Sequence, residues 1–286
     1  MTVPKTYIGS SIWRTVEPLH MKSLVPLLTD PHYGYFPQIG DALIERSRGM
    51  SATYFLNHTD AEVHLSLDSD IAEFTKAGID QMCEQAMKYD IVGGVYICRS
   101  TVRTSPATFF EEGDQITFAH DPTPVPVKWV ATGCLAVHRR VFEKMAETMP
   151  LLHKMDKERA FYPFYQSMIW DDPDAGKILL SEDYAFSQRA KDLGFTCYIN
   201  PAIRLAHIGQ YAHRLEDMGQ SMLAPQPLTL ERSGRMWRMR CEGTLETNER
   251  LGRLSPDEQA EANERFDSRA ERRRREKQEK KSLARA

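Results

Sequence analysis

The sequence lacks the features of a membrane-spanning, disulfide-rich or zinc-binding protein. In 286 residues no apolar run approaches the roughly 20 residues that a membrane-spanning helix requires. The N-terminal residues also lack the apolar segment of a signal peptide. The five cysteines are odd in number and dispersed, without a CxxC pair. This pattern argues against a disulfide framework or a zinc site and favours a reducing compartment, so we expect a cytoplasmic protein.

Positive charge is concentrated at the C-terminal end. The chain carries a net charge of −3, yet residues 271–286 hold eight Lys or Arg and three Glu, which leaves −8 on the remainder. After residue 255 the large apolar residues are Phe266 and Leu283, too few to build a core. We expect residues 255–286 to form a charged helix or a disordered tail. The basic run at residues 272–275 is either a weak contact for DNA or another polyanion, or a solvated helix.

The first two hundred residues alternate strand-like and helix-like segments, the pattern of an α/β domain. We expect strands at residues 7–12, 62–68, 91–97, 127–132 and 201–209, and helices at residues 18–29, 41–56, 79–89, 139–148 and 182–193. Asp41 is the expected N-cap of the second helix. Residues 100–126, rich in Pro, Thr and Gly, are expected to form a long loop or an irregular hairpin.

Two carboxylates follow a strand with a clear period of two. Val63, Leu65 and Leu67 share one face of this strand, which leads into Asp-Ser-Asp at residues 68–70. If the chain stays extended, the two aspartates lie on one side roughly 6–7 Å apart, and they repel unless a cation lies between them. Such oxygen ligands suit Mg²⁺ or Mn²⁺, which favour phosphate-bearing ligands. The alternative is an acidic turn in which Asp70 caps the next element.

A second acidic site begins the last expected helix. Ser181 is a natural N-cap, and Phe186 and Ala190 form the apolar face of the helix. Asp183 continues that face. Acidic residues in a first turn often only complement the helix dipole, which accounts for Glu182. A carboxylate on the buried face needs a partner or a use, and over a cleft Asp183 could act as a general base toward an acceptor hydroxyl.

His207 ends an apolar strand, on the face that it shares with Ile203 and Leu205. A lone histidine in this position is either a satisfied core residue or a metal ligand. Its place after the carboxylate pair and the acidic helix start favours a metal ligand.

The order of these segments resembles that of the GT-A-fold glycosyltransferases, particularly the family 2-like group and its short phage and bacterial versions. The resemblance covers about residues 7–209. Residues 68–70 match the DXD motif, which in this family holds a divalent metal and the diphosphate of a nucleotide-sugar. Residues 132–142 are similar to the family's segment of Gly, small residues and Arg-Arg, which lines the sugar pocket. Residues 181–195 match the acidic motif whose aspartate is the base in inverting members.

The resemblance implies a GT-A-like single domain at residues 1–215, with a mixed, mainly parallel sheet flanked by helices. Residues 216–254 would then be an extension packed on this domain. The implied activity is metal-dependent, hexosyltransferase-like transfer of a sugar from a nucleotide-diphosphate sugar to an acceptor hydroxyl, with inversion. Asp183 would be the base.

The resemblance also implies ligands for the metal and the donor. Mn²⁺ or Mg²⁺ would be held by Asp70 and His207, with Asp68 assisting and lying nearer the ribose or the sugar. One of two arginines on the helix before the DXD strand would face the diphosphate, unless both lie on a solvated face. The residues expected at the nucleotide-sugar are Ser10, Ser11, Arg46, Arg48, Asp68, Gly133 and Glu182.

Some features depart from the family or leave alternatives open. The chain has no QxxRW-type acceptor motif, so processive synthesis is not expected and the acceptor is open. A nucleotidyltransferase would carry a Gly-rich basic loop after the first strand, which residues 9–14 match poorly. Two further alternatives rest on the basic tail: a non-enzymatic nucleic-acid-associated protein, or a glycosyltransferase acting on modified phage DNA.

Overall fold

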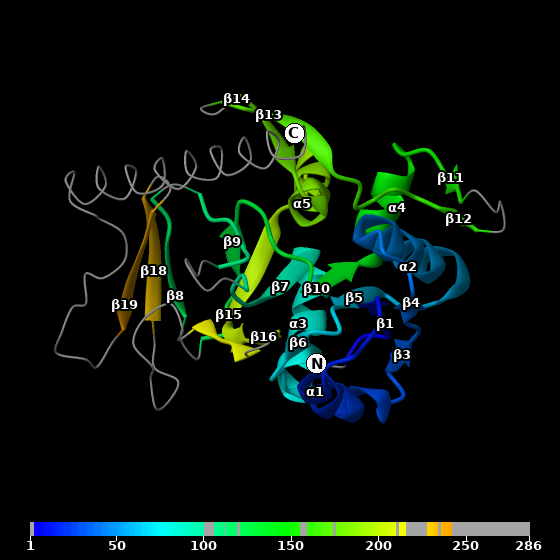
Figure 1. The fold of residues 1–286 in the computed structure, drawn as a ribbon, viewed down its shortest axis with the longest axis horizontal. Helices are drawn as coiled ribbons and strands as arrows, with labels where there is room; N and C mark the ends of the chain where they lie inside the picture. The colour runs from blue at the N-terminus through cyan, green and yellow to red at the C-terminus, as the bar shows by residue number, and fades with distance from the viewer. Residues whose placement is uncertain are drawn as a thin grey trace, which may run out of the picture.

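A mixed seven-stranded sheet forms the centre of the molecule (Figure 1). The computed structural model describes residues 3–99, 106–111, 113–118, 121–154, 159–173, 176–209, 212–215, 228–233 and 236–241, with backbone alone for residues 213, 228–233 and 236–241. In spatial order the strands of the central sheet are β3 (Tyr33–Tyr35), β1 (Thr6–Gly9), β5 (Val63–Leu67), β10 (Cys134–His138), β7 (Ile91–Val95), β15 (Cys197–Arg204) and β9 (Val125–Val127).

Five of these seven strands run in one direction. β1 pairs in parallel with β3 and β5, and β7 pairs in parallel with β15. β10 is antiparallel to both β5 and β7, and β9 is antiparallel to β15 at the edge. The sheet is therefore mixed, as expected, although only three of its six neighbouring pairs are parallel. The carboxyl ends of β1, β5 and β7 lie at the same edge as the start of β10.

Helices cover both faces of the sheet (Figure 1). They are α1 (Pro18–Leu28), α2 (Ile44–His58), α3 (Lys76–Tyr89), α4 (Arg139–Ala146) and α5 (Glu182–Asp192). On one face, buried phenylalanines of α2, α4 and α5 pack against the sheet, namely Phe55, Phe142 and Phe186. On the other face, Leu24 of α1 and Ile79 of α3 pack against the sheet.

The expected alternation in β5 is confirmed, but both of its faces are buried. Val63, Leu65 and Leu67 join the core beneath α1 and α3. His64 and Ser66 point to the opposite face and are also buried, because α2 and α4 cover it. A strand in the middle of an α/β sheet is enclosed on both sides, which an alternating sequence does not reveal.

Short strands form small sheets beside the central one. They are β2 (Ser11–Ile12) with β4 (Gln38–Ile39), β6 (Ile71–Ala72) with β16 (Ala206–Ile208) and β17 (Ala212–His213), β8 (Gln115–Phe118) with β18 (Leu228–Ser233) and β19 (Met236–Cys241), β11 (Leu152–His153) with β12 (Ala160–Phe161), and β13 (Met168–Asp172) with β14 (Gly176–Leu180). The pairing of β18 with β8 joins residues 228–233 to the segment expected as a loop. The charged tail expected at residues 255–286 lies outside the described residues.

Several expected element boundaries were wrong. The strand expected at residues 127–132 was misplaced: β9 ends at residue 127, β10 begins at residue 134, and the residues between them carry the chain from the sheet edge to its middle. Asp41 does not cap α2. Its carboxylate accepts the N–H of Leu43, the residue that takes the N-cap position, and pairs with Arg46. The helices expected around residues 18–29, 79–89, 139–148 and 182–193 are confirmed as α1, α3, α4 and α5.

No helix within the described ranges is long and apolar enough to cross a membrane. The four cysteines whose side chains are described, Cys83, Cys98, Cys134 and Cys197, are all free thiols.

Buried His64 makes stability depend on pH. Rings of Tyr7, Phe55 and Phe142 surround it, and burial lowers the pKa of its imidazole to about 3. Between that value and the ordinary pKa near 6.5 the unfolded chain binds the extra proton, so stability falls as pH falls through this window. We expect wild type to lose about 2–3 kcal/mol through this residue between pH 7.5 and pH 4.5.

The measurement is urea unfolding of wild type and His64→Leu at both pH values. The variant should have a smaller loss on acidification, while His58→Gln, a replacement at an exposed position, should lose as much as wild type. Equal losses in wild type and His64→Leu would contradict the assignment.

Candidate functional site

Polar side chains from distant segments meet at the carboxyl edge of the sheet. Asp68 follows β5, Thr132 and Gly133 precede β10, and Asp183 lies in the first turn of α5. Because β5 and β7 end at the edge where β10 begins, segments far apart in the chain converge there. Carboxyl ends of strands in α/β sheets are the usual position of ligand sites.

Arg48 of α2 is the centre of this group. Its Nη2 donates to Asp68 Oδ2 at 2.7 Å, and its Nη1 donates to Asp183 Oδ1 at 2.8 Å and to Glu182 Oε1 at 3.0 Å. The arginine side chain is only 6% exposed, whereas each of the three carboxylates is about one fifth exposed. We call Asp68, Glu182 and Asp183 the carboxylate cluster. The three carboxylates of the cluster are thus more exposed than the Arg48 guanidinium that they contact.

Burial and neighbouring charges shift the pKa values of Arg48 and Asp68. Burial alone would lower the pKa of Arg48, but Asp68, Asp183 and Glu182 outweigh it and raise that pKa above its usual value. Burial raises the pKa of Asp68, with help from the charges of Asp70 and Asp183, while Arg48 opposes this shift. One guanidinium therefore faces three carboxylates, and the excess negative charge favours a further cation.

Thr132 and Gly133 hold the cluster from the side of β10. The Thr132 hydroxyl donates to Asp183 Oδ1, the same oxygen that accepts from Arg48. The Gly133 N–H donates to Tyr96 Oη at 2.8 Å, and its carbonyl accepts the N–H of Asp68 at 2.9 Å. A Cβ at position 133 would lie 2.5 Å from Tyr96 Oη, so this approach requires glycine.

The Asp-Ser-Asp segment turns instead of staying extended, so the expected side-by-side placement of its aspartates on a strand was wrong. The Asp68 carbonyl accepts the N–H of Ile71, which closes a tight turn. Asp68 then faces Arg48, while Asp70 faces Arg99 and His207. The two carboxylates therefore have different partners.

Asp70 and His207 form a second group, which we call the Asp70–His207 pair. Asp70 Oδ2 lies 3.6 Å from His207 Nε2 and 3.1 Å from Arg99 Nη1. Burial raises the pKa of Asp70, but hydrogen bonding and charge from His207 and the charge of Arg99 outweigh it, so this pKa lies below its usual value. Asp70 is therefore a carboxylate at neutral pH.

Backbone pairing sets the position of the Asp70–His207 pair. His207 of β16 lies opposite Ile71 of β6, and the Ile208 N–H donates to the Asp70 carbonyl at 2.7 Å. His207 Nδ1 lies 2.9 Å from the Ile97 carbonyl, which can only accept, so Nδ1 carries the hydrogen. Nε2 then faces Asp70 with a lone pair in the neutral ring and with a hydrogen in the charged ring, which is the form that lowers the pKa of Asp70.

The pair fits a divalent cation. Two acceptors that face each other at 3.6 Å require a proton or a metal ion between them. Carboxylate oxygens suit Mg²⁺ and Mn²⁺, and a histidine that binds a metal commonly has its other ring nitrogen held by a carbonyl. Within the described ranges no group of three or more His, Cys, Asp or Glu is arranged as a metal site. An ion held by this pair alone would need water or phosphate oxygens as its further ligands.

The remaining expected contacts lie around these two groups. Arg46 is bidentate to Asp41, with Nη2 2.7 Å from Oδ1. Ser11 Oγ accepts from Ser47 Oγ at 2.8 Å, and buried Ser10 accepts a backbone hydrogen bond from β4. Carboxylates of this chain hold both arginines, so the contact of either with a diphosphate stays a prediction.

Sequence reasoning missed three residues of this site: Tyr96, Arg99 and Thr132. Tyr96 and Arg99 follow β7, and the end of the next long strand along the chain was the signal available for them. Thr132 precedes the glycine of the expected sugar-pocket segment. Its contact with Asp183 joins residues 51 positions apart, which no local pattern reports.

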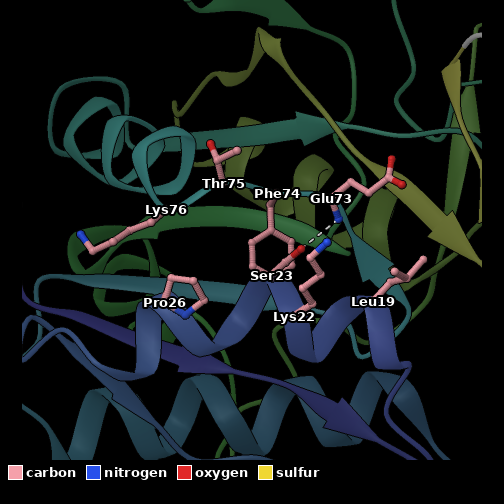
Figure 2. A pocket seen from close by; sticks show the side chains of 8 residues that line it. All are labelled: Leu19, Lys22, Ser23, Pro26, Glu73, Phe74, Thr75 and Lys76. Carbon is pink, nitrogen blue, oxygen red and sulfur yellow. Dashed lines mark hydrogen bonds between the residues drawn. The ribbon is translucent and has the colours of Figure 1, made fainter.

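A separate cavity of about 460 Å³ lies between α1 and the segment that joins β6 to α3 (Figure 2). Its lining is Leu19, Lys22, Ser23, Pro26, Glu73, Phe74, Thr75 and Lys76. Lys76 is paired with Asp30 and Asp80, and Glu73 with Arg214. The cavity shares no residue with the carboxylate cluster or with the Asp70–His207 pair.

Comparisons with known proteins do not identify a family. No protein-family model matches the sequence, and no curated protein matches it. Among solved structures, a crystal structure of A197 from STIV is similar with a TM-score of 0.46 and 15% sequence identity, over 72% of this chain and 86% of that chain. A likeness at this level does not bear on function.

Proposed function

We propose that this α/β protein is a metal-dependent glycosyltransferase that moves a sugar from a nucleotide-diphosphate sugar to an acceptor hydroxyl with inversion. The observation that carries the proposal is the convergence of Asp70, Asp183 and His207 at one sheet edge, although they lie far apart in the sequence. A cation-binding pair and a nearby carboxylate base are the two parts that this reaction needs.

Asp70 and His207 would hold Mn²⁺ or Mg²⁺. When bound, the ion would neutralise charge on the departing diphosphate. Asp68 would assist with one oxygen. Arg48 binds its Oδ2, so its other oxygen would face the nucleotide-sugar donor. Glu182 and Gly133 fix the positions of Arg48 and Asp68 from either side.

Asp183 is the proposed base. Both hydrogen bonds given to its side chain by the described residues end on Oδ1, from Arg48 and Thr132. This leaves Oδ2 for the proton of an acceptor hydroxyl. Polyanion binding through residues 271–286 stays a prediction, because the tail lies outside the described residues. A cytoplasmic location also stays a prediction.

The experiment that tests the function is a thermal-shift screen of nucleotide-sugars with and without Mn²⁺. We expect one donor class to raise the melting temperature only when Mn²⁺ is also present, because a ligand at 100 times its Kd adds about 2.7 kcal/mol of stability. Asp70→Asn should remove this joint stabilisation.

Asp171→Asn is the matched control, because Asp171 is a highly exposed aspartate on β13, away from the site. It should respond like wild type. If no nucleotide-sugar stabilises the protein with Mn²⁺, or if Asp70→Asn responds fully, the proposed function is wrong.

A further inference from the structure

Arg99 occupies a position that the proposed function leaves unused. It follows β7, and its side chain is 46% exposed, in contrast to the buried Arg48. Its Nη1 lies 3.1 Å from Asp70 Oδ2 and donates to the Ile208 carbonyl at 3.0 Å. One atom of the guanidinium is thus fixed beside the same Asp70 oxygen that faces His207 Nε2.

Arg99 and a divalent cation share one ligand atom. An ion held by the Asp70–His207 pair would use the oxygen that Arg99 now contacts, and a guanidinium so close to a divalent ion repels it. Arg99 therefore weakens the binding of a cation that arrives alone. It has no such effect on Asp68, whose partner is Arg48.

The other donors of Arg99 give it a second action. Among the described residues, neither its Nε nor its Nη2 has a hydrogen-bond or ion-pair partner. A guanidinium with one nitrogen anchored and two donors available suits a phosphate oxygen pair. If a diphosphate lies against both the cation and Arg99, its negative charge lies next to each of these two positive charges. The net interaction of Arg99 with the bound ligands is then attraction.

We propose that Arg99 couples the cation to the diphosphate: it lowers the affinity of the site for the cation alone and raises the affinity for the diphosphate that comes with it. This inference rests on the proposed function, since it requires a metal at the Asp70–His207 pair. Its consequence is that the site takes the cation and the diphosphate together.

The test measures two affinities of the full chain. Binding of Mn²⁺ alone is followed by the electron paramagnetic resonance signal of the free ion, and binding of inorganic pyrophosphate at saturating Mn²⁺ by calorimetry. In Arg99→Gln we expect Mn²⁺ alone to bind about fivefold more tightly and pyrophosphate about tenfold more weakly, the range of ordinary coupling between sites. These opposite directions are not what a merely disturbed site produces.

Two further variants define the cause. Arg99→Lys keeps the charge but loses the planar fork, so Mn²⁺ alone should bind as in wild type and pyrophosphate more weakly. Lys5→Gln removes the charge of an exposed lysine that pairs with Asp60 and precedes β1, at the other end of that strand from the site, and should change neither affinity.

The outcomes separate the two proposals. If wild type binds Mn²⁺ but Arg99→Gln changes neither affinity, or moves both in the same direction, the coupling role of Arg99 is overturned and the metal site stands. If wild type binds Mn²⁺ neither alone nor together with pyrophosphate, the proposed function fails and the coupling role fails with it.

Discussion

Replacement of Arg48 by Met is expected to lower the free energy of unfolding by about 3–5 kcal/mol. The variant leaves the carboxylate cluster without its guanidinium, and Asp68, Glu182 and Asp183 then repel one another in a partly buried space. Such a loss corresponds to a fall in melting temperature of roughly 10 °C for a domain of this size. Differential scanning calorimetry measures it directly.

The deficit should depend on pH. Arg48 opposes the rise that burial causes in the pKa of Asp68. In the variant Asp68 therefore binds a proton more readily, so the loss of stability should shrink as the pH falls from 8 to 5. Arg140→Met is the matched control, because Arg140 makes a bidentate contact with Asp90 but is 56% exposed. It should cost under about 1 kcal/mol. Equal losses in the free energy of unfolding for the two variants would show that the buried contacts of Arg48 stabilise the fold no more than the exposed contact of Arg140.

Asp183→Asn is expected to reduce sugar transfer by about 10²- to 10⁴-fold, the usual contribution of a general base. The reason lies in the two oxygens of Asp183. Asn retains an Oδ1 that can accept from Arg48 and Thr132, while an amide that cannot take a proton replaces Oδ2. The affinity for the nucleotide-sugar should therefore stay within about twofold of the wild-type value.

Turnover with the donor identified by the thermal-shift screen, and calorimetry with the same donor, provide the two readouts. Asp192→Asn, at the other end of α5 on an exposed position, controls for changes to the helix. If Asp183→Asn turns over at the wild-type rate, Asp183 is not the base. If it loses donor affinity as well, its role is in binding.

Much of the fold could be predicted because periodic patterns report directly on buried faces. The alternation of Val63, Leu65 and Leu67 identified β5 and its core-facing side. β10 was missed, because Cys134–His138 is apolar on both sides and carries no alternation. Asp41 was assigned as a cap since its residue type is typical of caps, but the chain enters α2 two residues later than that assignment requires.

The candidate site was predictable in its parts but not in its pairing. Asp68, Asp183 and His207 could be selected because the sequence pattern places each at an end of an expected element. The contacts of Arg48 join residues 20, 134 and 135 positions apart, and only the folded sheet brings them together. Arg139 is a related case: its sequence neighbours suggested a sugar pocket, yet its guanidinium donates to carbonyls at the end of α2.

The short pairing of β6 with β16 has a consequence for how this site can change over time. Main-chain hydrogen bonds, which any side chains except proline permit, hold Asp70 beside His207. Neighbouring residues such as Ala72 and Ala206 can therefore be replaced by other small residues without altering the spacing of the two candidate ligands. A site held in this way can persist while the sequence around it diverges past the point at which sequence comparison detects it.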